Sequence, residues 1–244
     1  MKNNKILVIS VLAAALSAST VYAETAAVTS EQKAEIEKII HEYLVKTNPE
    51  VLIEASQALQ GKQQAQMQEQ AKSAIAQNGS ALVSGSLTTA GNPKGNVTLV
   101  EFFDYQCVHC IKMKPVINEL IKKNPNLRVV FKEFPIFGKE SEMASRVAIV
   151  AAMQGKYMNF QNGLFNVNQR LDEKTIMAVA KKAGLDMSTL KSDMESKTVN
   201  EQLEASHKLA EAIHLMGTPA FVVLATPGGQ FKTGGQTAFI PRSY

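Results

Sequence analysis

The stretch VEFFDYQCVHCIKMKP, residues 100–115, contains both cysteines of this 244-residue chain. Only two residues separate Cys107 from Cys110, an apolar run of strand character leads into them, and a segment of helical character follows. Such a pair can be a structural disulfide, part of a metal site, or a redox centre. The remaining sequence decides which of these roles is favoured.

The N-terminal residues 1–23, MKNNKILVISVLAAALSASTVYA, have the three parts of a secretory signal peptide. A short basic start precedes an apolar core from Ile6 to Leu16, and small-residue spacing ends the segment at Ala23. The apolar core is too short for a bilayer span, which takes about 20 residues. We therefore predict that the mature protein begins at Glu24 and is exported to the periplasm.

The composition is that of a globular protein, with 45% hydrophobic and 20% charged residues. The formal charge is +4, and it falls to +2 when the two lysines of the signal peptide are subtracted. Because this charge is mild and no Lys/Arg-rich run occurs, nucleic acid is not an expected partner.

The spacing of the two cysteines argues against a structural disulfide, and the number of available ligands argues against a metal site. Closing so short a loop removes little entropy from the unfolded chain, although exported proteins commonly pair their cysteines. A structural zinc site needs four ligands. The histidines available beside the cysteines are His41, His109, His207 and His214. The first lies in a separate N-terminal segment and the last two are seven apart on one expected helix, so we expect no metal and no other cofactor.

A redox centre is the favoured role. A Cys-x-x-Cys motif at a strand-to-helix junction places its first thiol at a helix N-terminus, where free N–H groups and the macrodipole stabilise a thiolate. We predict that Cys107 is the exposed nucleophile of low pKa and that Cys110 is the shielded resolving thiol. His109 can add a positive charge or a hydrogen bond to the Cys107 thiolate. A stabilised thiolate favours the dithiol form, which makes the disulfide a stronger oxidant.

Residues 24–78 are expected to form a helical arm. Thr29 and Gln32 fit a capping box that starts one helix, and Asn48–Pro49 ends it and starts a second helix that runs to about Gln77. The apolar residues of the first helix share one stripe: Ile36, Ile39, Ile40, Tyr43 and Leu44. Two interpretations stay open, a solvated arm and a dimerisation arm whose stripe meets a second copy.

A second domain is expected at residues 97–244, after a Gly- and Ser-rich linker at 79–96. It opens with a strand at Val97–Phe103, a helix at Cys107–Lys123 and a strand at Leu127–Phe137. This order predicts a parallel βαβ unit.

An all-helical insertion is expected at about 141–212. Three glycines are expected to mark helix ends there: Gly155, Gly163 and Gly184. The chain then returns to a strand at Phe221–Ala225 and to a short strand and turn in QFKTGG, residues 230–235. The fold class is therefore α/β, with the helical insertion interrupting the sheet and the helical arm preceding it.

Two further pairs of residues are candidates for the site. Glu101 and Lys132 are either surface charges at strand ends or a partly buried pair that tunes Cys110 and relays its proton. Thr218–Pro219 stands at a strand start, where proline donates no hydrogen bond. A cis peptide bond would explain this placement, and it would set the Thr218 backbone beside the chain of a substrate.

These motifs resemble the DsbA-like thiol:disulfide oxidoreductases of the thioredoxin superfamily. The residues that carry the resemblance are FFDYQCVHC, the helical insertion and GTPAFVV. Four stretches, NPEVLIEASQALQ, GNVTLVEFFDYQC, FKEFPIFG and GKYMNFQNGLF, are most similar to the Com branch, a group of immunoreactive outer-membrane proteins. The resemblance covers nearly all of the mature chain, and it implies a thioredoxin-like fold and a place in the periplasm or cell envelope.

The resemblance also implies roles for single residues. Cys107 would be the nucleophile, Cys110 the resolving cysteine and His109 the thiolate stabiliser. Pro219, preceded by Thr218, would be a cis-proline. Glu101 and Lys132 fall where the family carries a buried charge pair.

The sequence departs from the family pattern in three places. Val108 stands where strong oxidants commonly have proline, and Thr218 rather than valine precedes Pro219, a feature more typical of isomerases. The sequence ends at GGQTAFIPRSY, where relatives usually continue into a final helix that would cover one face of the sheet.

The sequence predicts one function and leaves alternatives to it. We expect a periplasmic thiol:disulfide oxidoreductase, an oxidase with some isomerase activity, that acts on exported cysteine-containing proteins. A membrane partner would re-oxidise or re-reduce it, and the arm would make it a homodimer. The alternatives are mainly isomerase or reductase activity, or a non-catalytic surface antigen that keeps the fold.

Overall fold

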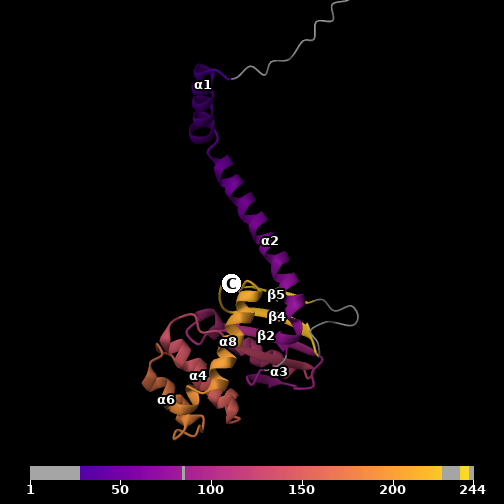
Figure 1. Ribbon diagram of the computed structural model, residues 1–244, viewed down its shortest axis with the longest axis vertical. Helices are drawn as coiled ribbons and strands as arrows, with labels where there is room; N and C mark the ends of the chain where they lie inside the picture. The colour runs from indigo at the N-terminus through magenta and orange to yellow at the C-terminus, as the bar shows by residue number, and fades with distance from the viewer. Residues whose placement is uncertain (1–27, 84–85, 227–236, 242–244) are drawn as a thin grey trace, which may run out of the picture. The chain divides into compact units, whose positions relative to one another are not determined.

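The computed structural model describes residues 28–83, 86–226 and 237–241 (Figure 1). The expected signal peptide at 1–23 and the expected strand and turn at 230–235 lie outside these residues. The chain divides between Ala58 and Leu59 into two compact units. Among the described residues, no helix has the length and apolar character that a bilayer span requires.

The first unit begins with the helix α1, Ser30–His41. The predicted capping box is present, since the Gln32 N–H donates to Thr29 Oγ1 at 3.2 Å and the Thr29 N–H donates to Gln32 Oε1 at 3.0 Å. A π-helical turn, η1, continues the helix over Glu42–Thr47 and ends at Asn48, where the sequence predicts a stop. The apolar stripe is open to solvent, with Ile39 57% and Ile40 50% exposed.

The helix α2, Glu50–Val83, is longer than the sequence predicts. Its predicted end at about Gln77 is wrong, and so is the expected linker at 79–96, because the chain stays helical to Val83 and then forms the strand β1, Thr89–Gly91. Burial explains the difference. Ala71, Ile75, Gly79, Leu82 and Val83 recur at helical spacing and are all buried, so packing outweighs the turn-forming character of Asn-Gly-Ser.

Within the described residues the sheet has five strands, in the order β1-β3-β2-β4-β5. The strands other than β1 are β2 (Val97–Phe103), β3 (Leu127–Glu133), β4 (Ala220–Ala225) and β5 (Ala238–Ile240). β2 and β3 are parallel and are joined by α3, Val108–Lys123, which confirms the predicted βαβ unit. β1, β4 and β5 join antiparallel to their neighbours.

Five helices form the insertion between β3 and β4. They are α4 (Lys139–Met153), α5 (Tyr157–Phe165), α6 (Glu173–Lys182), α7 (Leu190–Met194) and α8 (Lys197–Ala212). Gly155 and Gly184 follow helix ends with left-handed φ values of 67° and 85°, as predicted. Gly163 instead lies inside α5, where a Cβ atom would come within 2.9 Å of Val179 Cγ1. Close packing of α5 against α6 explains this glycine.

The sheet carries a core on each face because side chains alternate along a strand. On one face, Leu99 and Phe103 of β2 share a buried cluster with Ile117 of α3 and residues of the helical insertion. On the other face, Val100 and Phe102 pack with Ile75 of α2 and with the end of α8. Glu101 stands between Leu99 and Phe103 at an odd-numbered position. Its side chain therefore lies on the same face of the sheet, the one that α3 covers.

Candidate active site

Cys107 occupies the N-cap of α3, as its place between strand and helix predicts. Its backbone is extended, and its Sγ accepts a hydrogen bond from the Cys110 N–H at 3.4 Å. The Cys107 N–H donates to the Asp104 carbonyl at 3.1 Å, and its own carbonyl accepts from the Ile111 N–H at 3.0 Å. The first thiol is therefore held where the unpaired N–H groups of the helix converge.

The two thiols differ strongly in acidity. The pKa of Cys107 is lowered to about 5, chiefly by its hydrogen bond with the Cys110 side chain. Burial opposes this shift, while the Thr218 side chain and the backbone N–H groups of Cys110 and His109 add to it. Burial raises the pKa of Cys110 well above its ordinary range, and the hydrogen bond with Cys107 adds to the rise. Near neutral pH the reduced pair is therefore a Cys107 thiolate beside a Cys110 thiol.

The predicted exposure of Cys107 is wrong, because its side chain is only 3% exposed. The loop between α8 and β4 meets it: the Cys107 Sγ lies 3.3 Å from the Thr218 carbonyl and donates to it as a thiol. The Thr218–Pro219 peptide bond is cis, as predicted. The Thr218 hydroxyl is buried and has no hydrogen-bond partner among the described residues, so it is available to the Cys107 thiolate.

His109 contributes to the site through its backbone. It lies in the first turn of α3 with an exposed side chain, and its N–H group is among the causes that lower the Cys107 pKa. The predicted role of its imidazole stays a prediction.

The predicted pairing of Glu101 with Lys132 is wrong, although both side chains are buried. The register of β2 and β3 places Glu101 beside Phe131 and Lys132 beside Phe102. Directly paired residues share a face of the sheet, and successive residues of a strand alternate between the faces. The two charged side chains therefore project from opposite faces of the sheet. The cation whose charge acts on Glu101 is Lys114, which comes from α3.

Lys114 belongs to a chain of buried hydrogen bonds. Its Nζ donates to Gln161 Oε1, and the Gln161 Nε2 donates to the Tyr157 hydroxyl at 3.0 Å. The hydroxyls of Tyr157 and Tyr105 donate to Glu133 Oε1 at 2.9 and 3.2 Å. The Lys114 ammonium also lies 5.2 Å from the centre of the Phe131 ring. These partners satisfy a cation whose side chain would otherwise be costly to bury.

Three groups of this cluster have pKa values displaced toward neutrality. Burial raises the pKa of Glu101 to about 8, against the lowering effect of Lys114. Burial likewise raises the pKa of Glu133 to about 8, and it lowers the pKa of Lys114 to about 8, where Glu101 and Glu133 oppose it. Glu101 also raises the pKa of Cys110. The cluster beside the resolving thiol can therefore accept or release a proton near neutral pH.

Asp104 is a site residue that sequence reasoning missed. Its side chain is fully buried. Its Oδ1 accepts from the Gln106 N–H and the Ser141 hydroxyl, both at 2.7 Å, and its Oδ2 accepts from the N–H groups of Ile136 and Phe137 at 2.7 and 3.0 Å. These bonds fasten the turn before Cys107 to the segment between β3 and α4. An acidic residue directly after an apolar strand and just before the motif is the signal that could have identified it.

No group of three or more His, Cys, Asp or Glu residues in the described parts of the chain is arranged to hold a metal ion.

Two family models match this chain. The one described as DSBA-like thioredoxin domain matches residues 98–239, and the one described as Copper resistance protein ScsC N-terminal domain matches residues 32–66. A curated relative, the thiol:disulfide interchange protein DsbA of Bordetella parapertussis, is 30% identical over 152 residues. The match covers 57% of this chain and 66% of that protein, which is just under two thirds of its length.

Solved structures show the same similarity. BcfH of Salmonella enterica Typhimurium has a TM-score of 0.69 and 32% identity, covering 88% of this chain and 91% of its own. A thioredoxin-like oxidoreductase from Silicibacter pomeroyi DSS-3 has a TM-score of 0.57 and 36% identity, covering 62% of this chain and 88% of its own. The predicted thioredoxin-like fold with a helical insertion is confirmed.

Proposed function

Since this chain belongs to the DsbA-like family of thiol:disulfide oxidoreductases in the thioredoxin superfamily, we propose that it exchanges disulfides with exported cysteine-containing proteins. The redox centre is Cys107-Val108-His109-Cys110. The observation that carries this proposal is the opposite displacement of the two thiol pKa values, to about 5 for Cys107 and upward for Cys110. This asymmetry is what a nucleophile and a shielded resolving thiol require.

The exchange proceeds in two displacements. A substrate thiolate attacks Cys107 Sγ in the oxidised pair, a mixed disulfide forms, and Cys110 leaves as a thiolate that takes up a proton. A second substrate thiolate then attacks the substrate sulfur of the mixed disulfide and releases the Cys107 thiolate. The substrate loses two electrons and gains a disulfide, while the enzyme becomes the dithiol. The acidity of Cys107 makes it a good leaving group in the second step.

Glu101 is the proposed proton donor and acceptor for Cys110. Its charge acts on Cys110, and its pKa is raised to about 8. It therefore holds a proton at pH 7 that it can give to the departing Cys110 thiolate, and it can take the proton back when Cys110 attacks. Lys114 favours the ionised form of Glu101 and so keeps this exchange within reach of neutral pH.

The thiolate at Cys107 favours the oxidase direction, because stabilising the reduced form raises the reduction potential. We propose an oxidase with some isomerase activity in the periplasm, in keeping with the signal-peptide pattern of residues 1–23. A membrane protein would restore its redox state. The alternative is an isomerase, in which reduced Cys107 attacks a non-native disulfide of the substrate. Threonine at position 218, before Pro219, favours this alternative. A non-catalytic surface antigen would have no need for two thiols of such different acidity.

The exposed apolar stripe of α1 and η1 supports self-association. Ile36, Ile39, Ile40 and Tyr43 are 47–57% exposed. Burial of apolar surface contributes roughly 25 cal/mol per Å², and two-fold dimers are the commonest assemblies. We therefore keep the homodimer as the proposed state.

Two cysteine variants test the proposed roles. Cys107→Ser should abolish disulfide exchange, because no other thiol in the chain can replace it. Cys110→Ser should accumulate mixed disulfides with substrates, because Cys107 can still attack a substrate disulfide but no Cys110 thiolate can then displace it. Non-reducing gels of cells that produce each variant read out both effects. Adducts formed by Cys107→Ser but not by Cys110→Ser would reverse the roles. Equilibration of the wild-type protein with glutathione then gives the reduction potential, and a value near that of reducing thioredoxins, about −270 mV, would contradict the oxidase assignment.

A further inference from the structure

Two buried carboxyls and one buried ammonium share one face of the sheet. Glu101 in β2 is 3% exposed, and Glu133, the last residue of β3, is 2% exposed. The register of the two strands pairs Glu101 with Phe131, so Glu133, two residues beyond, projects from the same face. Lys114 reaches this face from α3, where its ammonium lies over the Phe131 ring. The proposed exchange reaction uses Glu101 and Lys114 but leaves Glu133 without a role.

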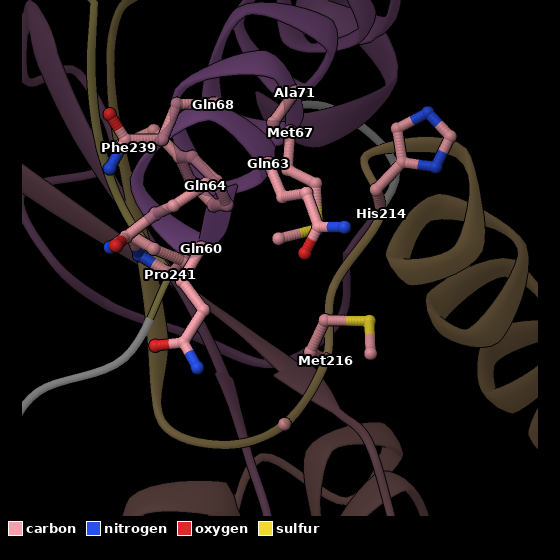
Figure 2. Close-up of a pocket in the computed structure, with 11 residues that line it drawn as sticks. Gln60, Gln63, Gln64, Met67, Gln68, Ala71, His214, Met216, Phe239 and Pro241 are labelled. Atoms are coloured by element: carbon pink, nitrogen blue, oxygen red, sulfur yellow. The ribbon is translucent and has the colours of Figure 1, made fainter. Parts of the chain in front are cut away.

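The other face of the sheet contributes little charge to this cluster. Lys132 projects from it, and the charge that acts on the pKa of Lys132 is that of Arg128. The groove beside α2, which packs on that face, has no acidic, lysine or arginine side chain among its described lining residues (Figure 2). The side chains that act on the two carboxyls come from the turn before α3 and from α3, α4 and α5: Asp104, Tyr105, Cys107, Lys114, Ser145 and Tyr157.

Charge balance requires one of the two carboxyls to be ionised. The Lys114 ammonium donates its hydrogen bond to the Gln161 amide oxygen rather than to a carboxylate, and Glu101 and Glu133 both raise its pKa. One ionised carboxylate balances the buried ammonium, whereas two would leave a net negative charge in the core and none would leave a net positive charge. In the balanced cluster the other carboxyl keeps its proton.

Hydrogen bonds single out Glu133 as the carboxyl that ionises. The Tyr157 and Tyr105 hydroxyls donate to Glu133 Oε1 at 2.9 and 3.2 Å, and both bonds lower its pKa. Glu133 Oε2 and the Ser145 hydroxyl have no hydrogen-bond partner among the described residues, yet this hydroxyl also acts to lower the Glu133 pKa. Burial and neighbouring charges act on Glu101, and the Glu133 charge raises its pKa. Since donated hydrogen bonds favour a carboxylate, Glu133 is the better anion and Glu101 the better acid.

We propose that Glu133 is a positioning residue of the redox reaction: its carboxylate, held by two tyrosine hydroxyls, keeps the proton of the buried cluster on Glu101. The inference rests on the proposed role of Glu101 as proton donor to Cys110. When the Cys107–Cys110 disulfide opens, the Cys110 sulfur takes the proton from Glu101, and Glu101 regains one from solvent. Glu133 itself gains and loses none. Because Tyr157 belongs to α5, the helical insertion takes part in setting the protonation of the site.

Removing the Glu133 charge tests the proposal. Glu133→Gln keeps an oxygen that accepts from the tyrosines, but Glu101 becomes the carboxylate that balances Lys114 and should ionise at lower pH. The rate at which Cys110 attacks a glutathione mixed disulfide of Cys107 is measured against pH. The midpoint of this profile should fall by about half a unit to one unit. Structural damage alone would lower the rate at every pH and leave the midpoint in place.

Two further variants separate charge from hydrogen bonding. Tyr105→Phe with Tyr157→Phe keeps the Glu133 carboxyl and removes both donors, so Glu133 should take up a proton and stop raising the Glu101 pKa. The midpoint should fall in this variant as well. Glu119→Gln is the control, because it removes a carboxylate of α3 whose side chain is 62% exposed, and it should keep the wild-type midpoint.

The reduced wild-type protein supplies a measurement that does not depend on the folding of any variant. Carbon-13 NMR of the glutamate side-chain carboxyls should show Glu133 ionising at lower pH than Glu101. The reverse order would overturn the proposal, as would a midpoint that stays or rises in Glu133→Gln or an equal fall in Glu119→Gln. Failure of the proposed function is a distinct result: the wild type would not exchange with glutathione, or Glu101→Gln would keep the wild-type profile.

Discussion

At the scale of single residues, position makes two identical side chains chemically different. Cys107 at the N-cap of α3 is acidic, whereas Cys110, one turn further along, is not. The motif and its helical context are visible in the sequence, so the order of acidity can be predicted from it. The burial of Cys107 cannot, because the covering loop at Thr218 is 111 residues away along the chain.

The Thr218 hydroxyl should matter for the acidity of Cys107. Thr218→Val keeps the shape of the side chain and removes the hydroxyl that helps to lower the Cys107 pKa. Hydrogen bonds to charged groups contribute about 1.5–3 kcal/mol, so the Cys107 pKa should rise by about one to two units. Thiolate absorbance titrated against pH measures this. Thr218→Ser keeps the hydroxyl and should titrate like the wild type, and a valine variant with an unchanged curve would contradict the assignment.

Lys114, rather than Lys132, should govern proton transfer at Cys110. Lys114→Met removes the charge that holds down the Glu101 pKa, so less Glu101 is ionised at pH 7 to accept the Cys110 proton. Attack of Cys110 on a glutathione mixed disulfide should slow about three- to tenfold at pH 7, and the midpoint of its pH profile should move up by half a unit to one unit.

Lys132→Met is the matched control for that measurement. It also removes a buried ammonium, but from the opposite face of the sheet. Its pH profile should stay at the wild-type midpoint. A shift in this variant but not in Lys114→Met would contradict the role assigned to Lys114. Single-chain periodicity could not decide between the two lysines, because the register of β3 against β2 determines which face each side chain reaches.

At the scale of elements, the βαβ unit was the easiest part to predict. The apolar run of β2 and the cysteine motif give the bounds of β2 and α3 to within a residue. The predicted end of the second strand at Phe137 is wrong, because β3 ends at Glu133. The end of α2 and the role of Asp104 were not predictable in this way, because both depend on contacts far along the chain. Asp104 bonds to residues about 32–37 positions away, and α2 continues through turn-forming residues because the sheet buries Leu82 and Val83.

The buried half of α2 should be part of the folding unit of the redox domain. Ile75 is fully buried against the sheet, whereas Leu59 of the same helix is 57% exposed. Ile75→Ala should lower the free energy of unfolding by about 2–5 kcal/mol, because it leaves a cavity in the core. Leu59→Ala should change it by no more than about 0.5 kcal/mol. Denaturant unfolding measures both values, and equal effects would place the whole of α2 outside the core.

At the scale of the whole molecule, the sequence predicted the order of a helical arm followed by a thioredoxin-like domain, but not where one unit gives way to the other. The division falls at Ala58, inside α2, and no break in the helical pattern marks it. The apolar stripe of α1 and η1 is the feature that connects the arm to a function, because most of its side chains are exposed among the described residues of the first unit, 28–58. A second copy of the chain is the occupant that we propose for it.

A pair of arm variants decides whether the stripe joins copies of the chain. Ile39→Glu puts a charge in the centre of the stripe and should convert the assembly to monomers at micromolar concentration, because a buried unpaired carboxylate is costly. Ala34→Glu adds the same charge to the exposed opposite face of α1, and it should leave the mass unchanged. Light scattering measures the mass of each protein. Wild-type protein that is already monomeric would remove the proposed dimer. Reaction with glutathione should be equal in all three proteins, since the redox centre lies outside the arm.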